Sequence, residues 1–357
     1  MTLVSPSRSC FLALDLSRNT SGGTMAHRLI HIGVGGRGKW SVNMVPNRDD
    51  YQSVALVDIR EDHLETAMGV TGLPESSCFR TLDQALNNVE ADAVVVITPP
   101  DLHTEHCLEA LRDGKHVLVE KPFTKTLADS RMLVEEAEKN GVTICVSQNA
   151  KYNAGAVTLN RLIRDEVYGK PCFGMHMALS WRKKGVHHSG EDDHAYLWER
   201  GIHDFDTMRF MFADTPKRMW AHDFNPSWSP YKAGAGAHAW IEFEGGATCG
   251  YLCCFESHKG AKMTRIDTEG GTLELDGGKL TLKHREKDEE EEIPLDECPD
   301  STTVIMNEWN KYLSDGVEPE FSGRNNLTTV AMVEGCGAAS EHGVVVDFKT
   351  YLETGSV

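Results

Sequence analysis

The first 150 residues alternate short apolar runs with segments of helix-forming composition. Each run has the length of a buried strand and contains few polar residues, which is typical of strands covered on both faces of a parallel sheet. Helices are expected between the runs, and the two over residues 102–113 and 126–140 are each followed by a glycine that can end a helix. This pattern predicts an α/β fold, a doubly wound (Rossmann) domain over residues 25–147. The five apolar runs are residues 29–32, 53–58, 91–97, 116–120 and 142–146.

The pattern changes after residue 147. One helix, expected over residues 154–165, precedes a series of strand-like segments between residues 173 and 284. Runs of strands without intervening helices indicate a mostly antiparallel sheet. Residues 148–357 are therefore expected to form an α+β domain with a large open sheet that binds substrate and mediates oligomerisation. Asp288–Glu292 is interpreted as a solvated loop. The expected hairpin turns are Gly245-Gly246, Gly270-Gly271 and Gly277-Gly278.

Composition excludes several classes of function. The chain carries 36 Lys and Arg residues against 54 Asp and Glu residues, a net charge of −18, which argues against nucleic acid as a partner. No apolar run reaches the length needed to cross a membrane. The ten cysteines show no C-x-x-C pairs and no regular spacing, so they are expected to be free thiols in a cytoplasmic protein. Residues 1–24 are interpreted as a disordered extension, with Met25 as a candidate start.

Gly33, Gly35 and Gly38 form a G-x-G-x-x-G turn directly after the first strand. In a dinucleotide-binding domain these glycines permit a tight turn, close approach of the pyrophosphate and close helix packing, and the neighbouring Gly36 and Arg37 belong to the same cofactor-binding turn. Asp58 ends the next strand, 20 residues beyond Gly38. Its carboxylate suits the ribose hydroxyls and repels a 2′-phosphate, which favours NAD, although Arg60 leaves NADP open.

Glu120-Lys121-Pro122 follows the fourth strand, at the edge of the sheet where ligands bind in open α/β folds. A lysine there can act in proton transfer, or it can be an ordinary exposed lysine at a strand end. From position alone, the two interpretations are equally supported.

Two segments resemble a known family: Thr98–His103 and Gly114–Pro122, which ends in Glu-Lys-Pro. They are similar to the glucose–fructose oxidoreductase / inositol dehydrogenase / rhizopine-catabolism (Gfo/Idh/MocA) oxidoreductases, and the similarity extends over residues 28–348. The resemblance implies that Glu120 and Lys121 face the nicotinamide ribose, with Lys121 near the reacting carbon. It also implies that Thr98, Pro99 and His103 line the cofactor. Pro100 stands where the family usually has Asn.

Glu199 and His203 are four residues apart, which would place them on one helix face. A histidine on an ordinary amphipathic helix is the simpler interpretation of this spacing. The family carries the motif Asp-x-Gly-x-His-x-x-Asp at this place. Three positions of this chain match the motif, Gly201, His203 and Asp206, and Glu199 stands in place of the first Asp. The resemblance therefore implies that His203 is catalytic, with Glu199 as a further catalytic candidate.

The remaining candidates for cofactor and substrate contacts lie after predicted strands or next to His203 in the sequence. Gln148 is predicted to contact the cofactor. The predicted substrate contacts are Lys151, Tyr152, Trp181, His203 and Asp204. The segment from His187 to His194 is rich in metal-ligand types, but its irregular spacing favours a loop of the substrate pocket, so no metal is predicted.

These features together predict an NAD-dependent dehydrogenase that transfers hydride to or from a secondary hydroxyl of a sugar, polyol or sugar derivative. The alternative is an NAD-dependent glycosidase or lyase that oxidises transiently, eliminates and reduces again without net redox change. A third possibility is a nucleotide-sensing regulatory protein, which the presence of both Lys121 and His203 disfavours. The resemblance further implies a homodimer or homotetramer.

Overall fold

The computed structural model describes residues 26–182 and 193–357. The expected extension over residues 1–24 and most of the histidine-rich segment, residues 187–192, lie outside the described residues. The described chain divides into two compact units. The first contains residues 26–148 and 302–327, and the second contains residues 149–182, 193–301 and 328–357. The sequence pattern had placed residues 302–327 in the second domain.

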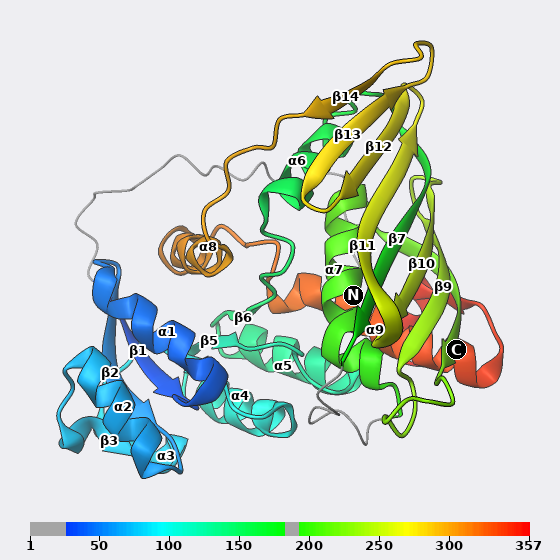
Figure 1. Ribbon diagram of the computed structural model, residues 1–357. Helices are drawn as coiled ribbons and strands as arrows, with labels where there is room; N and C mark the ends of the chain where they lie inside the picture. Colours follow the sequence, from blue (N-terminus) through cyan, green and yellow to red (C-terminus); the bar gives the residue numbers. More distant parts are fainter. Residues whose placement is uncertain (1–25, 183–192) are drawn as a thin grey trace. The chain divides into compact units, whose positions relative to one another are not determined.

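The first unit contains a six-stranded parallel sheet (Figure 1). Its strand order, β3-β2-β1-β4-β5-β6, is the order of the doubly wound nucleotide-binding fold, so the predicted fold class is confirmed. All four residues of β4 are completely buried, as expected for a strand covered on both faces. The strands are β1 (His27–Ile32), β2 (Tyr51–Val57), β3 (Cys78–Phe79), β4 (Ala93–Val96), β5 (His116–Val119) and β6 (Ile144–Val146).

Two helices of this unit, α3 and α5, begin at side-chain caps that the sequence supplies. The Thr81 hydroxyl accepts a hydrogen bond from the Gln84 amide, and Thr126 accepts one from the Asp129 amide, which satisfies amides at the two helix starts. The helices are α1 (Lys39–Met44), α2 (Glu61–Thr71), α3 (Leu82–Asn88), α4 (His103–Arg112), α5 (Leu127–Lys139) and α8 (Ser301–Asp315).

The second unit contains a nine-stranded sheet in the order β14-β13-β12-β11-β7-β10-β9-β8-β15. Only the β7–β10 pair among these described strands is parallel, so the predicted, mostly antiparallel sheet is confirmed. The strands are β7 (Pro171–Trp181), β8 (Pro216–Phe224), β9 (Gly236–Phe243), β10 (Thr248–Cys254), β11 (Glu256–Thr268), β12 (Gly271–Asp276), β13 (Lys279–His284), β14 (Glu290–Ile293) and β15 (Val346–Asp347).

The interpretation of Asp288–Glu292 as a loop was wrong in part, because Glu290–Ile293 form the edge strand β14. Its backbone pairs with β13, while its three glutamates stay exposed. A charged edge strand keeps its side chains in water and discourages pairing with other chains.

Helices α6 (Ala154–Arg164) and α7 (Ile202–Phe212) pack against one face of the nine-stranded sheet, and α6 also packs against α7 (Figure 1). A single π-helical turn, Leu197–Gly201, leads directly into α7. Two further helices, α9 (Gly323–His342) and α10 (Phe348–Thr354), follow later in the chain. Within the described ranges, no helix combines the length and the apolar character needed to cross a membrane.

Candidate functional site

The glycine turn of the first unit leaves no room for side chains at two of its positions. Gly33 has a φ of +81°, and a Cβ there would lie 2.3 Å from the Ile97 carbonyl oxygen. A Cβ at Gly38 would lie 1.7 Å from the Gly33 carbonyl oxygen. The residues between them continue into a short 3₁₀ turn, Gly36–Gly38, ahead of α1. Glycine is therefore required here by the backbone itself.

Asp58 follows β2 and faces the glycine turn. The Gly35 amide donates to Asp58 Oδ2 at 3.2 Å, and the Arg60 amide donates to Oδ1 at 2.9 Å. The His63 imidazole also contacts Oδ2, with Nδ1 at 3.1 Å. The carboxylate is thus held at the carboxyl end of β2, beside the backbone of the turn.

Glu120 and Lys121 follow β5, on the same edge of the sheet. The Arg37 guanidinium, which belongs to the glycine turn, donates from Nε to Glu120 Oε1 at 2.7 Å. The other oxygen of Glu120 accepts a hydrogen bond from the Lys121 amide at 2.7 Å. Glu120 is almost fully buried, whereas Lys121 is partly exposed. This chain of contacts links the glycine turn to the backbone of Lys121.

His103 and Gln148 are buried in the structure. The His103 imidazole lies between the carbonyl oxygens of Thr98, 3.0 Å from Nε2, and Pro122, 2.8 Å from Nδ1. Burial lowers the pKa of His103, although its hydrogen bonds to these carbonyls oppose that shift. His103 therefore ties the end of β4 to the Lys121-Pro122 turn, while Pro99 is exposed and Gln148 is completely buried.

Glu199 of the second unit lies on the π-helical turn, and His203 lies in the first turn of α7. The two residues are therefore on either side of a change in helical geometry rather than on one continuous α-helix. Such a π-turn inside a helix is frequently found at functional sites. His203 is partly exposed.

Glu199 forms an ion pair with Arg182. The Arg182 guanidinium also lies 3.7 Å from the centre of the Phe255 ring, and its Nη1 is 3.4 Å from the Tyr231 hydroxyl. Arg182 was not predicted as a site residue, because it lies 17 positions from Glu199 and belongs to no motif. Only the fold brings the two together.

Asp204, a predicted substrate contact, lies in the first turn of α7 and is buried. Its Oδ2 accepts hydrogen bonds from the hydroxyls of Tyr196 at 3.1 Å and Tyr251 at 2.8 Å. Burial alone would raise the pKa of Asp204, but the His176 imidazole 3.7 Å away and the hydrogen bond from Tyr251 outweigh it and lower that pKa. The contacts of this carboxylate are thus made inside the protein.

Lys151 and Tyr152, two further predicted substrate contacts, are also buried. Lys151 Nζ lies 3.1 Å from Asp206 Oδ2, and burial lowers the pKa of Lys151 to about 8. Tyr152 packs edge-on against Phe210. Trp181 differs, because it is half-exposed and packs edge-on against His258, with ring centres 5.1 Å apart.

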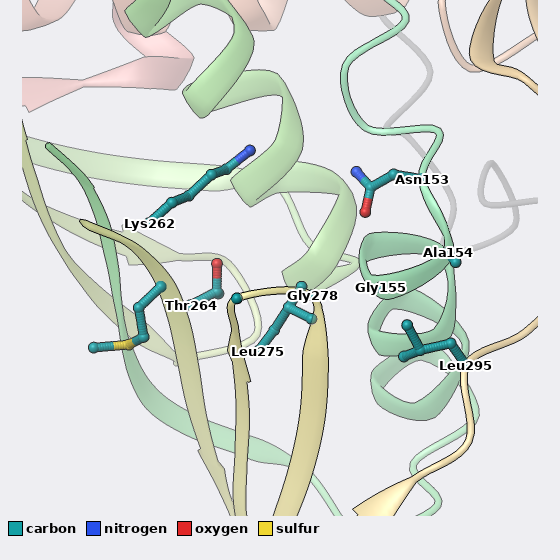
Figure 2. A pocket seen from close by; sticks show the side chains of 10 residues that line it. Asn153, Ala154, Gly155, Lys262, Thr264, Leu275, Gly278 and Leu295 are labelled. Atoms are coloured by element: carbon teal, nitrogen blue, oxygen red, sulfur yellow. The ribbon is translucent and has the colours of Figure 1, made fainter. Parts of the chain in front are cut away.

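A pocket of about 350 Å³ lies in the second unit, between the start of α6 and the β12–β13 hairpin (Figure 2). Asn153, Lys262 and Thr264 supply its polar lining, while Leu275 and Leu295 are among its apolar residues. This volume falls in the range of small-molecule sites. None of the predicted site residues lines the pocket.

The described part of the chain contains no cluster of three or more side chains suited to hold a metal ion. His194, the described end of the histidine-rich segment, lies between Asp223 and Glu341, with ring nitrogens 3.1 and 3.2 Å from their carboxylates. The nine described cysteines are all free thiols, as expected.

Comparison with known proteins agrees with this geometry. Residues 28–148 match the model of an oxidoreductase family with an NAD-binding Rossmann fold, and residues 156–274 match that of the GFO/IDH/MocA C-terminal domain. The chain belongs to the Gfo/Idh/MocA oxidoreductase family. The resemblance in the sequence is thereby confirmed, and so is the assignment as an oxidoreductase.

Similar proteins include dehydrogenases of sugars and polyols. D-apiose dehydrogenase of Paraburkholderia graminis is 26% identical over 85% of this chain and 84% of its own length. Inositol 2-dehydrogenase of an Arthrobacter species is 28% identical over 51% of this chain and 53% of its own length. A solved oxidoreductase from Agrobacterium radiobacter, in complex with NAD⁺, L-tartaric acid and magnesium, superposes with a TM-score of 0.80 at 20% identity, covering 92% of this chain and 99% of that one. These relatives agree with a dehydrogenase acting on CH–OH groups.

Proposed function

We propose that this protein transfers hydride between NAD and a secondary hydroxyl of a sugar, polyol or sugar derivative. The family assignment and the sugar and polyol dehydrogenases among its relatives support the substrate class. The observation that carries the proposal is the position of Glu120 and Lys121 at the carboxyl end of β5. Glu120 accepts hydrogen bonds from the Lys121 amide and from Arg37 of the glycine turn.

The residues of the first unit fit NAD. The backbone at Gly33 and Gly38 leaves no space for side chains, as the tight turn and close helix packing of a dinucleotide-binding domain require. Asp58 presents a fixed carboxylate beside Gly35, suited to accept hydrogen bonds from ribose hydroxyls. The same negative charge disfavours a 2′-phosphate, so NAD is proposed over NADP. When bound, the nicotinamide would accept or supply the hydride.

Oxidation of a secondary alcohol also releases the hydroxyl proton, which a nearby base must accept. We assign this role to His203, with Lys121 as a relay that stabilises the developing alkoxide. Glu199, paired with Arg182, fits a role in orienting the helix start that carries His203. Among the predicted substrate contacts, exposed Trp181 fits direct contact with a sugar ring, while buried Lys151, Tyr152 and Asp204 fit a supporting role.

Replacing Lys121 with Met tests the proposal. Because Glu120 is held by the Lys121 backbone amide, the side-chain change should leave NAD affinity within about threefold while turnover falls by about 100-fold or more. Binding is measured by calorimetry and turnover by absorbance at 340 nm. Lys125→Met is the matched control, because Lys125 forms an exposed ion pair with Asp101, and it should keep full turnover. Turnover of Lys121→Met at the wild-type level would contradict the assignment.

The substrate class is tested with the wild-type protein and a panel of polyols, aldoses and glycosides. Formation of NADH with a polyol or sugar is the expected result. Release of the aglycone from a glycoside without NADH would instead identify the redox-neutral alternative, which neither the geometry nor the relatives favour.

We further propose that the protein forms a homodimer or homotetramer through the open face of the nine-stranded sheet. Trp220, Trp240 and Met175 are exposed there in one row, on β8, β9 and β7, with Gly250 of β10 between Trp240 and Met175. Exposed apolar patches of this kind mark interaction surfaces. A cytoplasmic location stays a prediction, based on the thiol content.

A further inference from the structure

His63 has an unexpected position beside the predicted ribose-binding carboxylate. It lies in the first turn of α2, and its Nδ1 is 3.1 Å from Asp58 Oδ2. A Cβ built on Gly35 would lie only 2.0 Å from the same nitrogen, so the imidazole lies directly against the backbone of the glycine turn. Asp58 Oδ2 is therefore enclosed between the Gly35 amide and the His63 ring.

Arg60, the residue that left NADP open in the sequence, is engaged elsewhere. Its Nε and Nη2 bind both carboxylate oxygens of Asp62, at 3.0 and 2.7 Å. Only its backbone amide reaches Asp58. A second arginine in this region, Arg80, binds the Ile59 carbonyl and Glu61. The side chain that contacts Asp58 is thus an imidazole rather than a guanidinium.

We propose that His63 is a specificity-determining residue for the dinucleotide. It fixes the Asp58 carboxylate to receive ribose hydroxyls, and its ring fills the volume next to Asp58 and Gly35. If the adenosine ribose of NADP binds at Asp58, its 2′-phosphate must lie close to that carboxylate. The negative charge of Asp58 repels the phosphate there, and the imidazole of His63 occupies the space that the phosphate would need. This inference rests on the proposed function and deepens it, because it names the group that separates NAD from NADP.

The test measures binding of NAD and NADP to the full-length protein by calorimetry at pH 8. Wild type should bind NAD more tightly. His63→Ala, which removes the ring, should lower the ratio of the NADP to the NAD dissociation constant by about tenfold. His63→Gln, which keeps a hydrogen-bond donor for Asp58, should keep NAD affinity within about threefold of wild type. Arg60→Ala is the matched control and should leave the ratio within about twofold, because its side chain pairs with Asp62 at the surface.

An unchanged ratio in His63→Ala would overturn the inference, and so would a ratio that rises because NADP binding is lost. An effect of Arg60→Ala as large as that of His63→Ala would overturn it as well. Failure of the proposed function gives a different result, since no polyol or sugar in the substrate panel would then form NADH, whereas the dissociation constants report nucleotide binding alone. Far-ultraviolet circular dichroism verifies that each variant is folded, as expected for a change at the partly exposed His63.

Discussion

His31 on β1 is a buried histidine whose charge state controls the acid stability of the first unit. Its ring nitrogens lie 3.2 Å from the Ser41 hydroxyl and 3.0 Å from the Ser53 hydroxyl, contacts that a neutral imidazole satisfies with one donor and one acceptor. Burial lowers the pKa of His31 to about 4. Between the ordinary value near 6.5 and about 4, the unfolded chain binds a proton that the folded chain does not.

The free energy of unfolding should therefore fall as the pH falls from 6.5 to 4, by about 3 kcal/mol over the whole window from this residue alone. Above pH 6.5 the residue should contribute no pH dependence. Urea unfolding at pH 7 and 4.5 measures this. His31→Gln should reduce the loss of stability between the two pH values, whereas His342→Gln, at an exposed position, should not. An equal loss in wild type and His31→Gln would contradict the prediction.

Among the elements, the glycine turn between β1 and α1 should be the least tolerant of a methyl group. Gly38→Ala would bring a Cβ to 1.7 Å from the Gly33 carbonyl oxygen, so the backbone must move. We expect the free energy of unfolding to fall by about 3 kcal/mol or more and NAD binding to be lost. Gly69→Ala is the control, because Gly69 lies within α2 with open space around its Cα, and this change should stabilise the protein by about 0.5–1 kcal/mol. Equal effects of the two changes in urea unfolding would refute the argument.

The elements of this chain differ in how well the sequence predicts them. Buried strands such as β4 and capped helices such as α3 were predicted, because apolar runs and cap residues are local signals. The edge strand β14 was missed, because its glutamates have a loop-like composition and only pairing with β13 orders them. The π-helical turn before α7 was missed as well, since a helical pattern over a few residues does not distinguish π from α geometry.

The candidate site also contains features that the sequence predicts and features that only the folded structure shows. The glycine turn, Asp58 and Lys121 are predicted as site residues because sequence motifs carry them. The contacts that hold them are not, because the Arg37–Glu120 pair requires the ends of β1 and β5 to meet at one edge of the sheet, and the His63–Asp58 pair depends on how the chain turns from β2 into α2. Lys151 and Asp204 were predicted to meet substrate, yet their pairing with Asp206 and two tyrosines is a property of the packed interior.

At the scale of the whole molecule, the open face of the nine-stranded sheet predicts self-association. Trp220 and Trp240 are directly paired across β8 and β9 and are each about half-exposed, so assembly would bury a large apolar area. Trp240→Arg would place a charge in the middle of this row. Since Trp240 already stands at the surface, the variant should fold normally and sediment as a single chain, while wild type sediments as a dimer or tetramer.

Sedimentation velocity at about 10 μM measures this difference, well above the dissociation constant of a stable homodimer. Trp228→Arg is the matched control, because it adds the same charge at an exposed tryptophan outside the row and should leave the assembly intact. A wild-type protein that sediments as a single chain would refute the proposed interface, as would a Trp240→Arg variant that assembles like wild type. Dissociation by Trp228→Arg alone would place the interface at the end of the sheet near His258 instead, because Trp228 stacks on that ring.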